Sequence, residues 1–228
     1  MTRKTAARKS DDAARDAAMA TARALLDIRA IHCSAREPFK LTSGRLSPVY
    51  LDCRKLISYP AERTRLMDLG VELIRRDLAG EPLDMIAGGE TAGIPFAAWI
   101  AERMNLPMLY VRKQAKGFGR MAQIEGDLKE GARVLLVEDL ATDGGSKVNF
   151  VNALRAAGAV VSRSFVIFHY GIFASSEKIL SSIGVKLLAL ATWHDVLAVA
   201  ESEKRFDAAQ LAAIKSFIQD PENWTLRG

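Results

Sequence analysis

Short apolar runs alternate with amphipathic stretches over most of this chain, and this alternation constrains the fold more than any other feature. Runs such as 83–87 and 134–137 are too short for buried helices, so they predict strands. Stretches such as 60–78 instead have helical spacing, with Leu66 and Leu73 on one apolar face. Strands that alternate with helices usually form a parallel sheet covered on both faces. The sequence therefore predicts an α/β fold.

The same patterns assign an element to most segments after residue 16. Predicted helices cover 17–35, 60–78, 94–104, 146–157 and 174–182, and two more helices finish the chain. Predicted strands cover 39–41, 49–51, 83–87, 108–111, 134–137, 160–168 and 185–190. The polar, glycine-containing stretch 112–127 predicts an irregular loop.

These elements group into four expected parts. Residues 1–16 are polar and small, without a clear apolar face, and predict a flexible N-terminal extension, frayed or loosely helical. Residues 17–57 predict a small hood, and residues 58–200 predict the sheet core. Residues 201–228 predict a C-terminal helical extension with a polar tail.

Composition excludes several classes of protein. No apolar run approaches the roughly 20 residues of a membrane helix, and no signal-peptide pattern is present. Cys33 and Cys53 are too few and too far apart for a disulfide framework or a CxxC metal site, which favours a reducing, cytoplasmic location. The net charge of +5 suits nucleic acid or small phosphorylated substrates. Because aromatics are only 7% and no basic stretch contains them, we expect neither a nucleic-acid partner nor a membrane partner.

The segment Val134–Ser146 is the most specific feature. A buried strand delivers two adjacent carboxylates, Glu138 and Asp139, into a turn that precedes a helix. A helix start offers free backbone N–H groups to a phosphate, and carboxylates can accept hydrogen bonds from a ribose diol or hold Mg²⁺. One loop can therefore bind both the sugar and the phosphate of a ribose 5-phosphate. The alternative is a plain strand-to-helix turn in which Asp143-Gly144 is ordinary turn chemistry.

Residues Glu138–Ser146 resemble the phosphoribosyl pyrophosphate signature of the type I phosphoribosyltransferases. The resemblance implies a parallel five-stranded core sheet flanked by helices, a small N-terminal hood, and Mg²⁺ carried mainly by the substrate's pyrophosphate near Glu138 and Asp139. It also implies that these carboxylates face the ribose hydroxyls, that Thr142 to Ser146 cradle the 5-phosphate, and that Asp143 acts near the base. The implied binding residues are Glu138, Asp139, Leu140, Ala141, Thr142, Asp143, Gly144, Gly145 and Ser146.

A second segment, Phe39–Asp52, resembles the hood segment of orotate phosphoribosyltransferases. It offers hydroxyl and backbone donors to a carboxylated planar base, together with flat or apolar contacts. His169, which follows a predicted strand, is a further candidate for the site. The candidate orotate-binding residues are Ser43, Gly44, Tyr50, Leu51, Thr142 and His169. The alternative is a simple hairpin with a Ser-Gly-Arg turn.

The loop Arg112–Arg120 contains four cations and two glycines in nine residues. Mobile cations suit a leaving pyrophosphate, and glycines suit a lid that excludes water. Arg112, Lys113 and Lys116 match the family's flexible catalytic loop, which implies a homodimer whose 112–124 loop reaches the neighbouring active site. The alternative is a solvated basic loop.

The loop after the strand 83–87 matches the family's pyrophosphate loop in position, and its backbone N–H groups can bind phosphate. The residues that it contributes are Glu90, Thr91, Ala92 and Gly93.

Four positions depart from the family's pattern. Many members have Lys, Lys, His and Arg where this chain has Thr42, Ala92, Phe118 and Tyr170. Each change removes a cation or a proton donor. Lys40 and Arg120 are near enough in sequence to compensate.

The resemblance implies Mg²⁺-dependent transfer of ribose 5-phosphate from phosphoribosyl pyrophosphate to orotate, which gives orotidine 5′-monophosphate in pyrimidine biosynthesis. Three alternatives stay open. The base can be a purine or another pyrimidine, or the protein can be a phosphoribosyl-sensing regulator without turnover. A phosphatase or receiver built on Glu138 and Asp139 is the third, but it leaves the Gly-Gly-Ser helix start unexplained.

Overall fold

The computed structural model describes residues 3–41, 44–117, 123–142 and 145–225. Its helices are α1 (Arg3–Asp27), the 3-10 helix η1 (Cys53–Ser58), α2 (Pro60–Leu78), α3 (Gly93–Met104), α4 (Gly145–Ala156), α5 (Ala174–Ser182), α6 (Trp193–Ser202) and α7 (Ala208–Gln219). Its strands are β1 (Ile31–Cys33), β2 (Phe39–Lys40), β3 (Leu46–Ser47), β4 (Val49–Leu51), β5 (Met85–Gly89), β6 (Met108–Val111), β7 (Ile124–Glu125), β8 (Arg133–Ala141), β9 (Val160–His169) and β10 (Lys186–Thr192).

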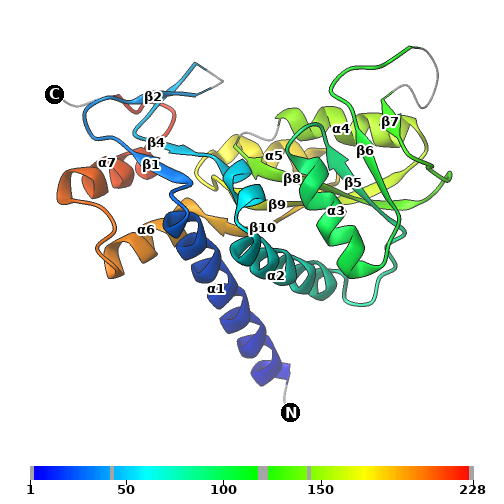
Figure 1. Cartoon of the computed structure of the whole chain (residues 1–228), viewed down its shortest axis with the longest axis horizontal. Coiled ribbons are helices and arrows are strands. Elements are labelled where there is room, and N and C mark those ends of the chain that lie inside the picture. The colour runs from blue at the N-terminus through cyan, green and yellow to red at the C-terminus, as the bar shows by residue number, and fades with distance from the viewer. Residues whose placement is uncertain (1–2, 42–43, 118–122, 143–144, 226–228) are drawn as a thin grey trace.

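A six-stranded sheet in the order β10-β9-β8-β5-β6-β7 forms the centre of the molecule (Figure 1). The first five strands of this order are parallel, which confirms the predicted five-stranded parallel core. The sixth strand, β7, is antiparallel to β6 and lies in the stretch 112–127, so the prediction that this whole stretch is irregular was wrong. A two-residue strand is too short to produce the alternation that identifies strands in a sequence.

Helices cover both faces of this sheet. One apolar cluster includes Leu135 and Val137 of β8 and packs with α1, α2, α3 and α6, whereas a second includes Val134 and Leu136 and packs with α4 and α5. Successive residues of a strand point to opposite faces, so a strand that is buried on both faces is apolar throughout. Within the described ranges, no helix is long and apolar enough to span a lipid bilayer.

The helix predicted over 17–35 differs from the structure at both ends. The observed helix α1 begins at Arg3 and ends at Asp27, and its N-terminal half projects beyond the body (Figure 1). Arg29 then has a left-handed backbone with φ of 54°, and Ile31–Cys33 form a strand that pairs with β4. Ile28 and Ile31 fit a helical spacing, but pairing with a distant strand decides the conformation of the second isoleucine, and a local pattern cannot report that pairing.

The hood strands lie beside the last helix of the chain (Figure 1). The antiparallel pairs β1–β4 and β2–β3 form two small two-stranded sheets. The Gln210 amide on α7 donates a hydrogen bond of 3.2 Å to the carbonyl of Cys33 on β1. The N-terminal and C-terminal parts of the chain therefore contact each other, while the predicted division into four parts stays a prediction.

Asp77 on α2 ties this helix to two strands of the sheet. Its carboxylate accepts hydrogen bonds from Arg163 on β9, at 2.7 Å, and from Lys186 on β10. Burial alone would raise the pKa of Asp77, but the hydrogen bonds from these two cations outweigh it and hold the pKa below its ordinary value. The charged carboxylate is therefore more stable in the folded than in the unfolded protein.

We expect Asp77→Asn to lower the free energy of unfolding by about 2 kcal/mol at pH 7, because two charge-assisted hydrogen bonds are weakened. Since the folded-state pKa lies below the unfolded-state pKa, this stabilisation is present above about pH 4 and is lost as the pH falls through the folded-state pKa. Urea denaturation at pH 7 and pH 3 measures both effects. Asp68→Asn is the control, because Asp68 is exposed and forms a surface pair with Arg103. A difference from wild type that stays constant down to pH 3 would contradict this account.

Candidate active site

A cavity of about 430 Å³ opens at the carboxyl ends of β5 and β8, between the hood edge and the first turns of α4. Ligands bind at this end of the strands in open α/β sheets. The cavity brings together the loop after β5, the end of β8 and the hood segment. Its walls are formed by Tyr50, Leu51, Asp52, Arg54, Glu90, Thr91, Ala92, Lys113, Glu138, Asp139, Leu140, Thr142, Lys147 and Phe150.

The acidic pair forms one wall of the cavity. Glu138 and Asp139 lie within β8, which pairs with β9 as far as Ala141 and is longer than the predicted strand 134–137. Burial, and next the negative charge of Glu138, raise the pKa of Asp139, while Lys147 acts in the opposite direction. Two neighbouring carboxylates thus sit where a sugar or a cation can reach them.

Lys147, in the first turns of α4, is a residue of the site that the sequence patterns did not single out. Its side chain is 2% exposed, and its ammonium donates hydrogen bonds of 2.7 Å to Glu138 Oε2 and 2.6 Å to the carbonyl of Leu140. A charged lysine directly after the Gly-Gly-Ser helix start was the only sequence signal present. That signal did not reveal that the lysine turns inward.

The loop after β5 packs directly against the end of β8. A Cβ atom on Gly89 would lie 2.7 Å from Glu138 Oε1, and one on Gly93 would lie 2.3 Å from the carbonyl oxygen of Val137. Glu90 Oε2 accepts a hydrogen bond of 2.7 Å from the backbone N–H of Lys113, which links this loop to the loop after β6. The peptide between Glu90 and Thr91 is cis. At positions 89 and 93 an added Cβ atom would therefore collide with the end of β8, which accounts for glycine at both.

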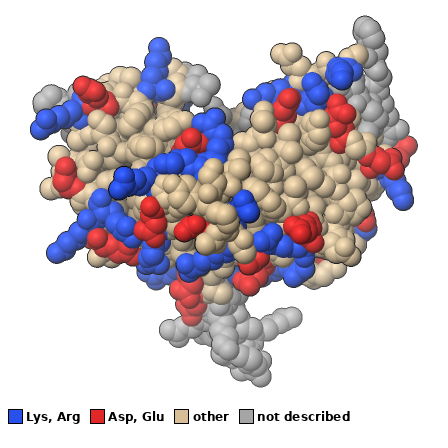
Figure 2. Space-filling view, in the orientation of Figure 1, with Lys and Arg blue, Asp and Glu red and all other residues tan. Residues whose placement is uncertain are grey.

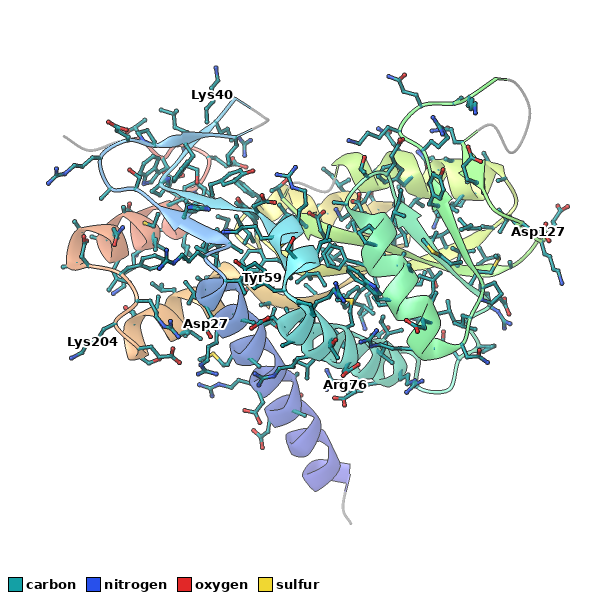
Figure 3. The ribbon with its side chains drawn as sticks, in the orientation of Figure 1. Asp27, Lys40, Tyr59, Arg76, Asp127 and Lys204 are labelled. Carbon is teal, nitrogen blue, oxygen red and sulfur yellow. The ribbon has the colours of Figure 1, made fainter. Side chains whose placement is uncertain are left out.

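The hood contributes a polar edge to the cavity. Arg54 donates to the Asp52 carboxylate at 2.7 Å and to the Tyr50 hydroxyl at 3.2 Å. The hydrogen bond to Asp52 raises the pKa of Arg54. Tyr50 and Leu51 were predicted to contact a base, and both line the cavity. Lys40 points outward from the tip of the hood, away from the cavity (Figure 3), so it does not replace a missing cation there.

Several candidates do not line the cavity. Gly44 and Lys116 are exposed, and His169 is buried at the end of β9. Arg112 lies beside Glu125, with 3.3 Å between the nearest charged atoms. Tyr170, one of the departures, is buried among aromatic rings, and burial raises its pKa. The candidates Ser43, Asp143 and Gly144, the departures Thr42 and Phe118, Arg120, and the side chain of Ser146 lie outside the described residues.

Charge on the face drawn in Figure 2 is mixed, with Lys and Arg side chains interspersed with Asp and Glu. The upper edge of the molecule dips between the hood at the left and the part at the right that carries α4, β6 and β7 (Figures 1 and 2).

Comparison with known proteins identifies the family. Residues 61–187 match the model of the phosphoribosyl transferase domain. The orotate phosphoribosyltransferase of Roseobacter denitrificans is 54% identical over 92% of this chain and 94% of its own length. That of Cereibacter sphaeroides is 57% identical over 90% of this chain and 88% of its own. The crystal structure of the enzyme from Aeropyrum pernix superposes with a TM-score of 0.68 and 33% identity, over 82% of this chain and 99% of that one. The chain therefore belongs to the orotate phosphoribosyltransferases, pentosyltransferases that act in pyrimidine biosynthesis.

Proposed function

We propose that the cavity binds phosphoribosyl pyrophosphate and orotate side by side, and that the chain transfers ribose 5-phosphate between them with the help of Mg²⁺. The observation that carries this proposal is the meeting of the acidic pair, the loop after β5 and the hood residues Tyr50 and Leu51 in one cavity. A sugar phosphate needs acceptors for its hydroxyls and donors for its phosphate, and the cavity is built from both.

Glu138 and Asp139 are the proposed acceptors for the two ribose hydroxyls. The backbone N–H groups at the start of α4, together with Thr142, are the proposed donors to the 5-phosphate, because a helix N-terminus carries partial positive charge. The loop formed by Glu90, Thr91, Ala92 and Gly93 would hold the pyrophosphate through its backbone. Tyr50 and Leu51 would contact the orotate ring from the hood, with Ser43, Gly44 and Thr142 as donors. His169 stays a candidate only through its position at the end of β9.

Mg²⁺ fits this site as a partner of the substrate. Among the described residues no group of three or more His, Cys, Asp or Glu side chains is arranged to hold a metal. One of the two carboxylates, Glu138, is already paired with Lys147. Mg²⁺ commonly uses one or two carboxylates plus substrate phosphates and water, so Asp139 and Glu138 would face an ion held mainly by the pyrophosphate. When bound, the ion would offset charge on the leaving group.

The reaction is a displacement at C1 of the ribose. An orotate ring nitrogen forms a bond to C1 as the bond from C1 to the pyrophosphate oxygen breaks. The electron pair of the broken bond leaves with the pyrophosphate, and the proton that the nitrogen carried passes to the departing pyrophosphate or to water. Positive charge grows on the ribose ring and negative charge grows on the leaving pyrophosphate. The acidic pair stabilises the positive charge on the ribose. Arg112, Lys113 and Lys116 stabilise the negative charge on the pyrophosphate. Asp143 is the proposed group nearest the base.

We further propose a homodimer in which the loop 112–124 starts at the cavity of its own chain, with Lys113, and reaches the neighbouring subunit's active site. Lys116 is exposed and lies outside the cavity of its own chain. Arg112 Nε is buried and lacks a hydrogen-bond partner among the described residues. Such an atom gains a partner if the loop moves onto a bound pyrophosphate. The free thiols Cys33 and Cys53 support a reducing, cytoplasmic location.

The reaction is tested by the loss of orotate absorbance when phosphoribosyl pyrophosphate and Mg²⁺ are added to the pure protein. We expect a loss that stops when a chelator removes the metal. Pyrophosphate release with a different base, and none with orotate, would move the substrate to that base. Binding of phosphoribosyl pyrophosphate without turnover of any base would favour the sensing regulator.

A further inference from the structure

Lys147 is the only Lys or Arg among the buried residues in the part of the chain that the structure describes. Taking an ammonium out of water costs several kcal/mol unless a charged partner and hydrogen bonds compensate. Here the compensation comes from the carboxylate of Glu138 and the carbonyl of Leu140, which lie on the last residues of β8. The ammonium therefore joins the end of β8 to the first turns of α4, the two ends of the loop proposed to hold the 5-phosphate.

Glu138 is held from two sides. Its Oε2 accepts the hydrogen bond from Lys147, and its Oε1 lies so close to Gly89 that a Cβ atom there would be only 2.7 Å away. The ring of Phe150 lies at the same position, 2.9 Å from that hypothetical Cβ. A carboxylate confined in this way presents its remaining lone pairs in one direction, which is what an acceptor for a sugar hydroxyl requires.

The same contact changes the charge of the cavity. Without a cation, the acidic pair would present two negative charges to a substrate that itself carries several. Pairing with Lys147 neutralises one of them, since the two charged groups are 2.7 Å apart. The loop after β5 contributes Glu90, Thr91 and Ala92 to this cavity, and none of these is a cation. The cation that neutralises Glu138 is Lys147, which comes from α4.

We propose that Lys147 is a positioning residue for the phosphoribosyl donor: it orients Glu138 toward a ribose hydroxyl and offsets one charge of the acidic pair. The inference rests on the proposed function of this cavity. It predicts that Lys147 acts through Glu138, so its effect depends on the Glu138 charge.

Binding of ribose 5-phosphate in the presence of chelator tests the inference without metal and without turnover. We expect Lys147→Met, which keeps an unbranched stem as far as Cε and removes the ammonium, to raise the dissociation constant on the order of tenfold or more, because a charge-assisted hydrogen bond and its orientation are lost. In turnover assays the KM for phosphoribosyl pyrophosphate should rise by a similar factor, while the KM for orotate should stay within about twofold of wild type. Lys215→Met is the control, since Lys215 pairs with Glu201 on the surface of the C-terminal helices.

A double-mutant cycle separates positioning from direct contact. Glu138→Gln should weaken ribose 5-phosphate binding, and adding Lys147→Met should weaken it no further. Effects that multiply would show that Lys147 acts independently of Glu138 and would overturn the proposal. Lys147→Met with a lowered Tm but wild-type ribose 5-phosphate binding would also overturn it, because the lysine would then serve only the fold.

If the single Lys147→Met variant does not fold, the comparison of Glu138→Gln with the double variant still decides, because the double variant leaves no unpaired charge buried. Equal binding by these two proteins supports the inference, and weaker binding by the double variant overturns it. Wild-type protein that binds ribose 5-phosphate but does not consume orotate would refute the proposed reaction while leaving the Lys147 test intact.

Discussion

Lys116→Met is expected to lower kcat by about 100-fold or more, because an ammonium that offsets charge on the leaving pyrophosphate contributes mainly in the transition state. Lys116 is exposed in a loop, so the free energy of unfolding should change by less than about 0.5 kcal/mol. The KM for orotate should change little. Steady-state kinetics and thermal denaturation measure the two effects. Lys129→Met is the control, because Lys129 lies at the opposite end of the sheet.

A mixing experiment asks which subunit's cavity Lys116 serves. A Lys116→Met protein keeps its acidic pair, and an Asp139→Asn protein keeps its cationic loop. If the loop acts on the neighbouring subunit, each mixed dimer contains one site with both parts intact. Random mixing of equal amounts should then restore about a quarter of the wild-type activity in a two-fold symmetric dimer. A mixture no more active than its two components would show that the loop acts within its own chain or that no dimer forms.

The sheet and the position of the cavity could be predicted because they depend on local patterns and one general rule. Apolar runs such as 134–137 mark strands that are buried on both faces. The rule that parallel strands present their carboxyl ends at one edge then brings Glu90 and Asp139 together, although 49 residues separate them in the chain. Neither step needs knowledge of side-chain packing.

The features that sequence patterns missed depend on contacts between distant residues. β1 was assigned to a helix because its strand partner, β4, lies beyond a hairpin. The inward direction of Lys147 is set by Glu138, at a spacing that belongs to neither a helix nor a strand. The pairing of Arg112 with Glu125, 13 residues further along the chain, is likewise a contact that no local pattern reports. A residue's type indicates which chemistry its side chain can perform, whereas packing decides where that side chain points.

Gly93 packs directly against the backbone of β8 at the site. It is the first residue of α3, and a Cβ atom there would lie 2.3 Å from the carbonyl oxygen of Val137 and 3.2 Å from the Cα of Glu138. Both atoms belong to the backbone of β8, so no side-chain rotation can make room. An added methyl group must move the start of α3 or the end of β8, and the acidic pair lies on that end.

We therefore expect Gly93→Ala to lower the free energy of unfolding by about 3 kcal/mol, which is large for a single methyl group, because overpacking against backbone cannot relax locally. Binding of ribose 5-phosphate should weaken in parallel, since displacement of β8 displaces Glu138 and Asp139. Gly80→Ala gives the opposite case. Gly80 has φ of 91°, and a Cβ atom added there would meet nothing within 4 Å beyond its chain neighbours, so that change tests backbone strain without a steric contact and should cost about 1 kcal/mol. Urea denaturation and calorimetric binding measure the pair. A Gly93→Ala protein as stable as wild type would show that the close contact with the backbone of β8 is relieved without cost. Loss of stability with unchanged binding would show that the acidic pair keeps its position when α3 moves, and that the movement is taken up by the helix.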